Sequence, residues 1–325
     1  MRILCNTYAN SRIIAPFPAG AAKIDTSTRK TVLTMLCGTF SLATMAAFVH
    51  GLGEQYHWTF VLVIRISLTF FVALTAAAIL RVRPVVFGSR ALWSRSIFGT
   101  IAMTCNFYAL THLTITDALT LLKTSPIWVS IIVAILNRRM HSPAMWLAVA
   151  IGLSGVVVME QPKFEGNAFP ISVAVFSAFF IAASQVSMGY LKQVPTLKIV
   201  IHFSGCASLT TFVLFLIVDK VPSLDALSWL DARWLIVMAV FGTIGQVGIT
   251  TAFRKGNPML MALVGLASIP LAALYDYMFW ENTLGLIETA GIGLIAISIM
   301  LCSREMIREQ NGQSVENPKK SAALL

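Results

Sequence analysis

The chain is poor in charge and in cysteine. Only 12% of its 325 residues are Asp, Glu, Lys or Arg, whereas about 25% is usual in soluble domains. So few charges cannot cover the surface of a soluble globule of this size, which excludes a soluble fold. The five cysteines form no C-x-x-C pair and no Cys/His cluster, so neither a zinc site nor a disulfide framework is expected. We therefore predict no metal and no cofactor.

Long apolar runs are what the chain has instead. Hydrophobic residues make up 57% of it, and a helix needs about 20 apolar residues to cross the bilayer. Ten runs meet this requirement, approximately at 32–51, 59–80, 94–111, 116–136, 143–160, 168–190, 197–218, 233–253, 258–280 and 284–302. The sequence therefore predicts an all-α integral membrane protein with ten transmembrane helices.

Basic residues gather in alternate connections between these runs. The net charge of +10 comes from 24 Lys and Arg against 14 Asp and Glu, and positive residues in short loops stay on the cytoplasmic side. With the N-terminus inside, most basic residues are cytoplasmic. The connection after the second run contributes Arg81, Arg83, Arg90 and Arg95. Both termini are therefore predicted to be cytoplasmic. Because Pro16 and Pro18 interrupt the apolar stretch near the N-terminus, we expect no secretory signal and predict a multi-pass inner-membrane protein.

Two of the runs contain a matching proline element. Pro126 lies in the fourth run and Pro270 in the ninth, each following a serine within two residues. Five runs per half is an odd number, so the second half must enter the membrane in the opposite sense, as in inverted repeats. The predicted units are a cytoplasmic tail 1–30, five-helix repeats 31–160 and 168–302, and a cytoplasmic tail 303–325 that we expect to be disordered.

These features resemble the EamA-type family of the drug/metabolite transporter superfamily. The resemblance rests on an Arg early in the second run, here Arg65, and on the Ser/Pro element of the fourth run. Where the family has Glu-Arg at the end of that helix, this chain has Asn137 and Arg138, and the second repeat keeps the acid as Glu281. The resemblance covers about 31–302. It implies two inverted five-helix repeats, both ends cytoplasmic, and transport of a small metabolite without ATP hydrolysis.

Two basic residues lie inside the apolar runs. A charge at the bilayer centre costs about 2.5–3.5 kcal/mol on insertion scales, so it should face the bundle interior or water. Arg65 either contacts an anionic solute, because guanidinium binds carboxylate bidentately, or clamps a nearby helix end or acid. Lys123, just before Thr124, either lines a cavity beside the carbonyl that Pro126 frees or snorkels to the outer interface. We favour the cavity, because Lys123 lies about 12 Å deep along the helix.

Other polar and aromatic residues of the third, fourth, eighth and ninth runs complete the candidate site. Asp117, Glu160 and Asp276 either carry a coupling proton or end helices in water. Gln246 lies among glycines at every third position, so it either binds solute or joins packed helices. The predicted substrate-binding residues are Arg65, Asn106, Tyr108, Lys123, Ser125, Trp128, Gln246, Ser268, Tyr275 and Asp276, with Pro126 and Pro270 as hinges.

Three functions fit this sequence. We favour a secondary transporter of an amino-acid, vitamin or nucleotide-like solute that works by alternating access. An exporter of lipid-like or amphiphilic compounds would have the same fold. An integral-membrane acyltransferase would use His112 and Asp117, which have the spacing H-x4-D. We expect no enzyme activity and no nucleic-acid partner. The expected partners are a small-molecule solute and the lipid bilayer, and a homodimer is left open.

Overall fold

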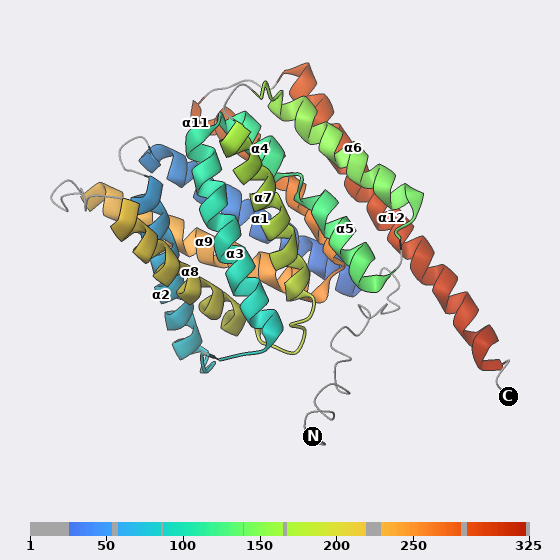
Figure 1. Ribbon diagram of the computed structural model, residues 1–325. Helices are drawn as coiled ribbons and strands as arrows, with labels where there is room; N and C mark the ends of the chain where they lie inside the picture. The colour runs from blue at the N-terminus through green and yellow to red at the C-terminus, as the bar shows by residue number, and fades with distance from the viewer. Residues whose placement is uncertain are drawn as a thin grey trace.

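The computed structural model describes residues 26–53, 58–85, 87–138, 140–164, 168–218, 229–280 and 285–322. These residues form helices and contain no strand, as the sequence predicts (Figure 1). The helices are α1 (Thr26–Gly53), α2 (Trp58–Ile79), α3 (Arg90–His112), α4 (Ile115–Leu122), α5 (Ser125–Asn137), α6 (Pro143–Glu160), α7 (Ala168–Met188), α8 (Thr196–Val218), α9 (Trp229–Lys255), α10 (Pro258–Val264), the 3-10 helix η2 (Gly265–Ala267), α11 (Ser268–Trp280) and α12 (Leu286–Ala322).

Eight segments of the described chain are long and apolar enough to cross a membrane. Two of these candidate spans contain an interruption: Asp117–Asn137 covers both α4 and α5, and Pro258–Tyr275 covers α10, η2 and part of α11. The eight do not include α1 and α3. The protein is therefore an all-α membrane protein whose fourth and ninth predicted helices are each divided near the predicted proline element.

The C-terminal tail differs from expectation. The sequence predicts disorder from residue 303, but α12 continues without a break to Ala322. Figure 1 shows its last turns extending beyond the helix bundle. Residues 303–322 contain Gly312 and Pro318 but otherwise carry mainly charged and small residues that are compatible with a helix. The prediction of disorder is therefore wrong as far as Ala322.

Local capping sets several helix ends. Ser89 accepts a hydrogen bond from the backbone N–H of Leu92 at the start of α3, and Ser142 does the same at the start of α6, whose first residue is Pro143. Asn257 accepts from two backbone N–H groups at the start of α10. These are the residue types that satisfy the free N–H groups of a first helical turn.

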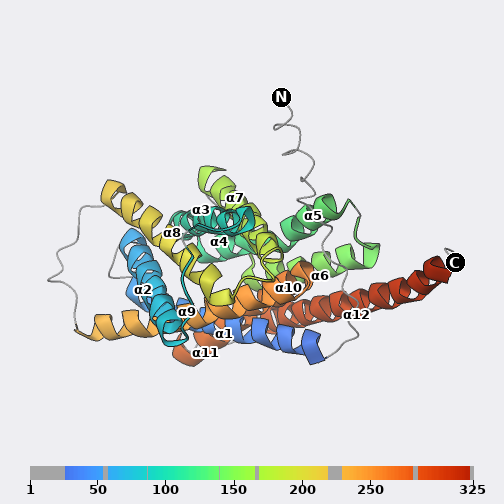
Figure 2. The ribbon, with the colours of Figure 1, turned by 90° about the horizontal axis from the view of Figure 1, so that it is seen from below.

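The helices pack in pairs that are distant in sequence. α1 packs on α9, α2 on α8, α3 on α7 and α6 on α12. Figures 1 and 2 both show α6 beside α12. A Cβ atom on Gly155 of α6 would lie 2.9 Å from the carbonyl oxygen of Gly291 in α12, and one on Gly248 of α9 would lie 2.7 Å from the Cα of Gly38 in α1. Only glycine allows these backbones to come so close, so the glycines around Gln246 serve helix packing.

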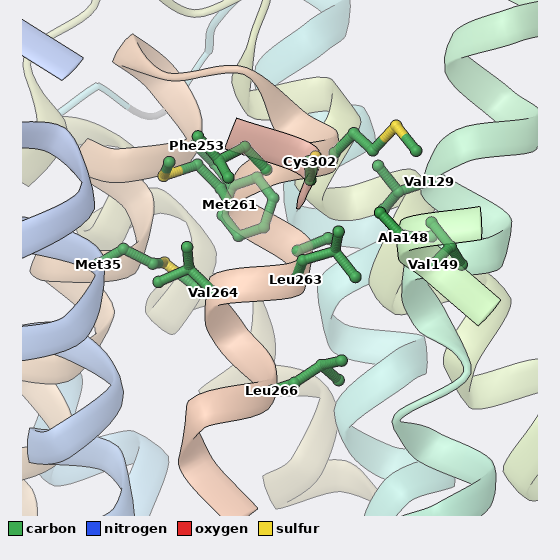
Figure 3. Close-up of a cluster of buried hydrophobic side chains, with 14 of the residues drawn as sticks. Met35, Val129, Ala148, Val149, Phe253, Met261, Leu263, Val264, Leu266 and Cys302 are labelled. Atoms are coloured by element: carbon green, nitrogen blue, oxygen red, sulfur yellow. The ribbon is translucent and has the colours of Figure 1, made fainter. Parts of the chain in front are cut away.

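The largest apolar core surrounds the second interruption. Every residue of α10 is buried. Figure 3 shows Leu263 and Val264 of this short helix between Met35 of α1 and Val129 of α5. Side chains of α6 and α12 close the same cluster. The ninth predicted helix is therefore fully buried in the segment just before the point where it is divided.

Candidate functional site

Lys123 lies between α4 and α5, where the fourth predicted helix is divided. Its backbone N–H donates to the carbonyl of Leu119, 2.9 Å away, and closes α4. Pro126 is the second residue of α5, and because proline has no N–H, the hydrogen-bond ladder cannot continue through it. The predicted interruption thus occurs just before the proline, and it holds the partly buried Lys123 and the buried Ser125.

The Lys123 ammonium donates a hydrogen bond to the hydroxyl of Ser268, the first residue of α11. The Ser268 hydroxyl in turn donates to the carbonyl of Gly265 in η2, 3.0 Å away. Glu160, the last residue of α6, acts on the ammonium through its charge. The two divided helices therefore meet through one ammonium and one hydroxyl, both among the predicted site residues.

Arg65 of α2 faces α3. The carbon at the centre of its guanidinium lies 5.5 Å from the centre of the Phe107 ring, within the range of a cation–π contact. The neighbouring Asn106 has a buried side-chain oxygen that accepts no hydrogen bond. Neither Arg65 nor Lys123 forms an ion pair with a carboxylate within the described ranges. Among the described residues, neither group thus has a carboxylate at ion-pair distance, although the charge of Glu160 acts on Lys123.

The three predicted aromatic residues lie in different contacts. Tyr108 stacks on His112, with ring centres 3.9 Å apart, and Trp128 meets Phe179 of α7 edge-on. The Tyr275 hydroxyl lies 2.5 Å from that of Thr44 in α1. The side chain of Asp276 lies outside the described residues. Pro270 is the third residue of α11.

Asp117 is part of a loop anchor. It is fully buried, and its carboxylate accepts hydrogen bonds from the backbone N–H groups of Lys163 and Phe164 at 2.9 and 3.0 Å. The interpretation that it ends a helix in water is therefore wrong. His112 Nδ1 lies 2.9 Å from the carbonyl oxygen of Tyr108. The acyltransferase hypothesis requires the Asp117 carboxylate, but this carboxylate binds the backbone of the connection between α6 and α7.

Arg95 is buried within a helix. The sequence predicts it in the connection after the second run, but α3 begins at Arg90 and Arg95 is only 5% exposed. Its guanidinium lies 4.0 Å from the centre of the Phe203 ring and donates to Ser184 Oγ at 2.9 Å and to Gln246 Oε1 at 3.4 Å. The capping residue Ser89 was the signal that places Arg95 inside the helix.

No group of three His, Cys, Asp or Glu side chains within the described ranges could hold a metal ion. The polar groups that meet between the two divided helices are an ammonium and a hydroxyl, which can bind an anion or a hydrogen-bonding solute. They come from helices of both halves of the chain.

Comparison with known proteins agrees with this architecture. No family model matches the chain. The pseudopaline exporter CntI of Pseudomonas aeruginosa is 26% identical over 219 residues, which cover 67% of this chain and 76% of that protein. An uncharacterized transporter of Helicobacter pylori is 23% identical over 66% of this chain and 73% of its own length. Human solute carrier family 35 member G1 is 25% identical over 58% of this chain and 55% of its own length.

A solved crystal structure has the same fold. It superposes with a TM-score of 0.74 at 15% sequence identity, over 85% of this chain and 98% of the other. The relatives from Pseudomonas aeruginosa and Helicobacter pylori are named transporters, and the described chain has eight helical candidate spans, two of them interrupted. The chain is therefore a multi-pass inner-membrane protein that is similar in sequence to bacterial transporters.

Proposed function

We propose that the chain is a secondary exporter of a small metabolite that carries a carboxylate or phosphate group, such as an amino-acid, vitamin or nucleotide-like solute. The observation that carries this proposal is the position of Lys123. Its ammonium lies where the two divided helices meet, hydrogen-bonded to Ser268 and without an ion pair in the described ranges. An ionisable side chain within a membrane helix is costly and commonly belongs to a substrate or ion pathway.

The proposed mechanism is alternating access between two inverted repeats of five helices. In this scheme α1 to α6 form the first repeat and α7 to α12 the second, with both termini cytoplasmic and ten membrane crossings. The pattern of packing supports it: exchanging the repeats turns the α1–α9 pair into the α7–α3 pair and the α2–α9 pair into α8–α3, while α6–α12 and α2–α8 map onto themselves. Rocking of one repeat against the other would then expose the site to each side in turn.

Export is favoured over uptake by the relatives. CntI of Pseudomonas aeruginosa is named an exporter of pseudopaline, and it matches two thirds of this chain. The anionic character of the solute is inferred from the chain itself, because Arg65 and Lys123 are the groups that would face it. Guanidinium and ammonium groups bind carboxylate and phosphate by charge-assisted hydrogen bonds.

Purified protein in liposomes tests the proposal. Liposomes loaded with radiolabelled glutamate, succinate, AMP or pseudopaline should release at least one of these anions faster than liposomes without protein, and glucose should be retained equally by both. The same release is measured with and without an imposed pH gradient, which separates proton coupling from exchange. Movement of an amphiphilic dye, with none of the anions transported, would contradict the proposal and favour export of lipid-like compounds.

A further inference from the structure

Arg95 of α3 lies where α3 meets α7, α8 and α9. Ser184 of α7, Phe203 of α8 and Gln246 of α9 contact its guanidinium. Gly99, one turn further along α3, leaves the necessary room, because a Cβ atom there would collide with Nη1 of Arg95 and lie 2.8 Å from the Phe203 ring. The packing of four helices is thus shaped around this one guanidinium.

The hydrogen bonds of Arg95 are incomplete. A guanidinium has five N–H donors. Its bond to Gln246 Oε1 is long, at 3.4 Å, and its Nε is buried without an acceptor. Ser184 and Gln246 are neutral, and no carboxylate pairs with Arg95 in the part of the chain that the structure describes. A buried charge with neutral partners remains uncompensated, and a second ion of opposite sign would stabilise it.

Further polar groups lie beside Arg95, Ser184 and Phe203 in the sequence or bind to such neighbours. The hydroxyl of Ser96 lies 2.7 Å from Nδ1 of His202, and those of Ser94 and Ser187 lie 2.9 Å apart. The side-chain oxygen of Gln185 is buried without a donor. Hydroxyl groups that are held by exchangeable partners can turn to donate to an incoming oxygen anion. The surroundings of Arg95 are therefore polar on α3, α7 and α8, with no acid facing it among these groups.

The Arg95 position is separate from that of Arg65. Arg65 lies against Phe107, which follows Arg95 by three and a third turns on α3, or about 18 Å along the helix axis. The Arg95 guanidinium reaches the level of Gly99, eight residues or about 12 Å along the axis before Phe107, so the two guanidinium groups contact α3 at different heights.

We propose that Arg95, with Ser184 and Gln246, forms a second anion-binding site, which takes a carboxylate or phosphate group of the solute closer to the start of α3 than Arg65 does. This inference rests on the proposed function. In the proposed orientation α3 begins at the cytoplasmic face, so Arg95 receives the solute from the cytoplasm before it reaches Lys123. Binding replaces the long bond to Gln246 with a charge-assisted pair.

Binding of succinate and inorganic phosphate to the purified full-length protein tests this site, with thermal stabilisation and calorimetry as readouts. R95Q should weaken binding of the responding anion at least tenfold, R95K should bind it with intermediate affinity, and R90Q at the exposed start of α3 should bind it like the wild type. Unchanged affinity in a folded R95Q protein would overturn the inference. The wild type could also bind neither succinate nor phosphate and still transport another anion of the liposome assay. That result would overturn the inference for these two ligands, and the proposed function would stand.

A second variant guards against loss of folding in R95Q. Q246E places a carboxylate beside Arg95 at nearly unchanged volume, so it should occupy the site from within. We expect a higher melting temperature without ligand and at least tenfold weaker anion binding. A higher melting temperature with unchanged binding would show a purely structural role and overturn the proposed site. A protein that neither binds nor transports any of the anions tested would contradict the proposed function itself.

Discussion

The two divided helices are both interrupted close to a proline, but they carry different side chains at the interruption. When Pro126 is aligned with Pro270, Lys123 falls opposite Ala267 and Thr124 opposite Ser268. The first interruption thus supplies an ammonium donor and the second supplies the hydroxyl that accepts from it. A similar opening of the helix in both halves therefore produces an asymmetric site, because only one half carries the charge.

Their surroundings differ as well. Residues Pro258–Val264 before the second interruption are all buried in the largest apolar core, whereas α4 before the first interruption has partly exposed positions such as Leu119. The second interruption is therefore an anchored element and the first is more loosely held. Under the proposed function, the rigid half would position the hydroxyl and the other half would carry the ammonium that binds solute.

Truncation of aligned leucines should show this difference most strongly. Leu263 is fully buried, and Leu119 is its counterpart when the prolines are aligned. We expect Leu263→Ala to lower the free energy of unfolding by about 2–5 kcal/mol, because it removes buried methyl groups and leaves a cavity. Leu119→Ala should cost clearly less. Unfolding in mixed detergent micelles, followed by tryptophan fluorescence, measures both, and equal losses would contradict the difference in anchoring.

Removal of the charge from the first interruption should have the next largest effect. Lys123→Met keeps the apolar stem and loses the ammonium. Hydrogen bonds to charged groups contribute about 1.5–3 kcal/mol, so release of the transported anion from liposomes should fall about tenfold or more. Lys123→Arg should retain part of the activity. Lys163→Met removes an exposed lysine and serves as the control, and full activity of Lys123→Met would remove Lys123 from the site.

The helices that follow the two interruptions, α6 and α12, join the halves through glycine. A Cβ atom on Gly291 would lie 2.8 Å from the carbonyl oxygen of Gly155, whereas one on Gly293 would meet nothing within 4 Å. Gly291→Ala should therefore destabilise the protein by about 1–3 kcal/mol through overpacking. Gly293→Ala should be neutral or stabilise by up to about 1 kcal/mol, because alanine favours the helix. Identical unfolding curves for the two variants would show that the halves do not depend on this contact.

The sequence could predict the features that depend on local chemistry. Pro126 and Pro270 indicate where a helix is divided, and the depth of Lys123 in an apolar run indicates a special position. The partners of these residues come from distant segments and could not be predicted. Burial of Arg95 depends on acceptors in α7 and α9, and Tyr275 pairs with Thr44 of α1. An aromatic residue that packs between helices has the same sequence pattern as one that lines a cavity.

The hydroxyl groups at the aligned positions offer the most sensitive test of the asymmetry. Ser268 accepts from the Lys123 ammonium, whereas the Thr124 hydroxyl donates to the carbonyl of Leu121 in its own helix. Ser268→Ala should slow anion release roughly two- to tenfold. This factor corresponds to about 0.5–1.5 kcal/mol, the free energy that a typical hydrogen bond contributes. Thr124→Ala should leave release nearly unchanged. Both variants could instead lose activity equally while their unfolding curves match that of the wild type. The two hydroxyl groups would then contribute alike to transport, and the proposed asymmetry between the two interruptions would be wrong.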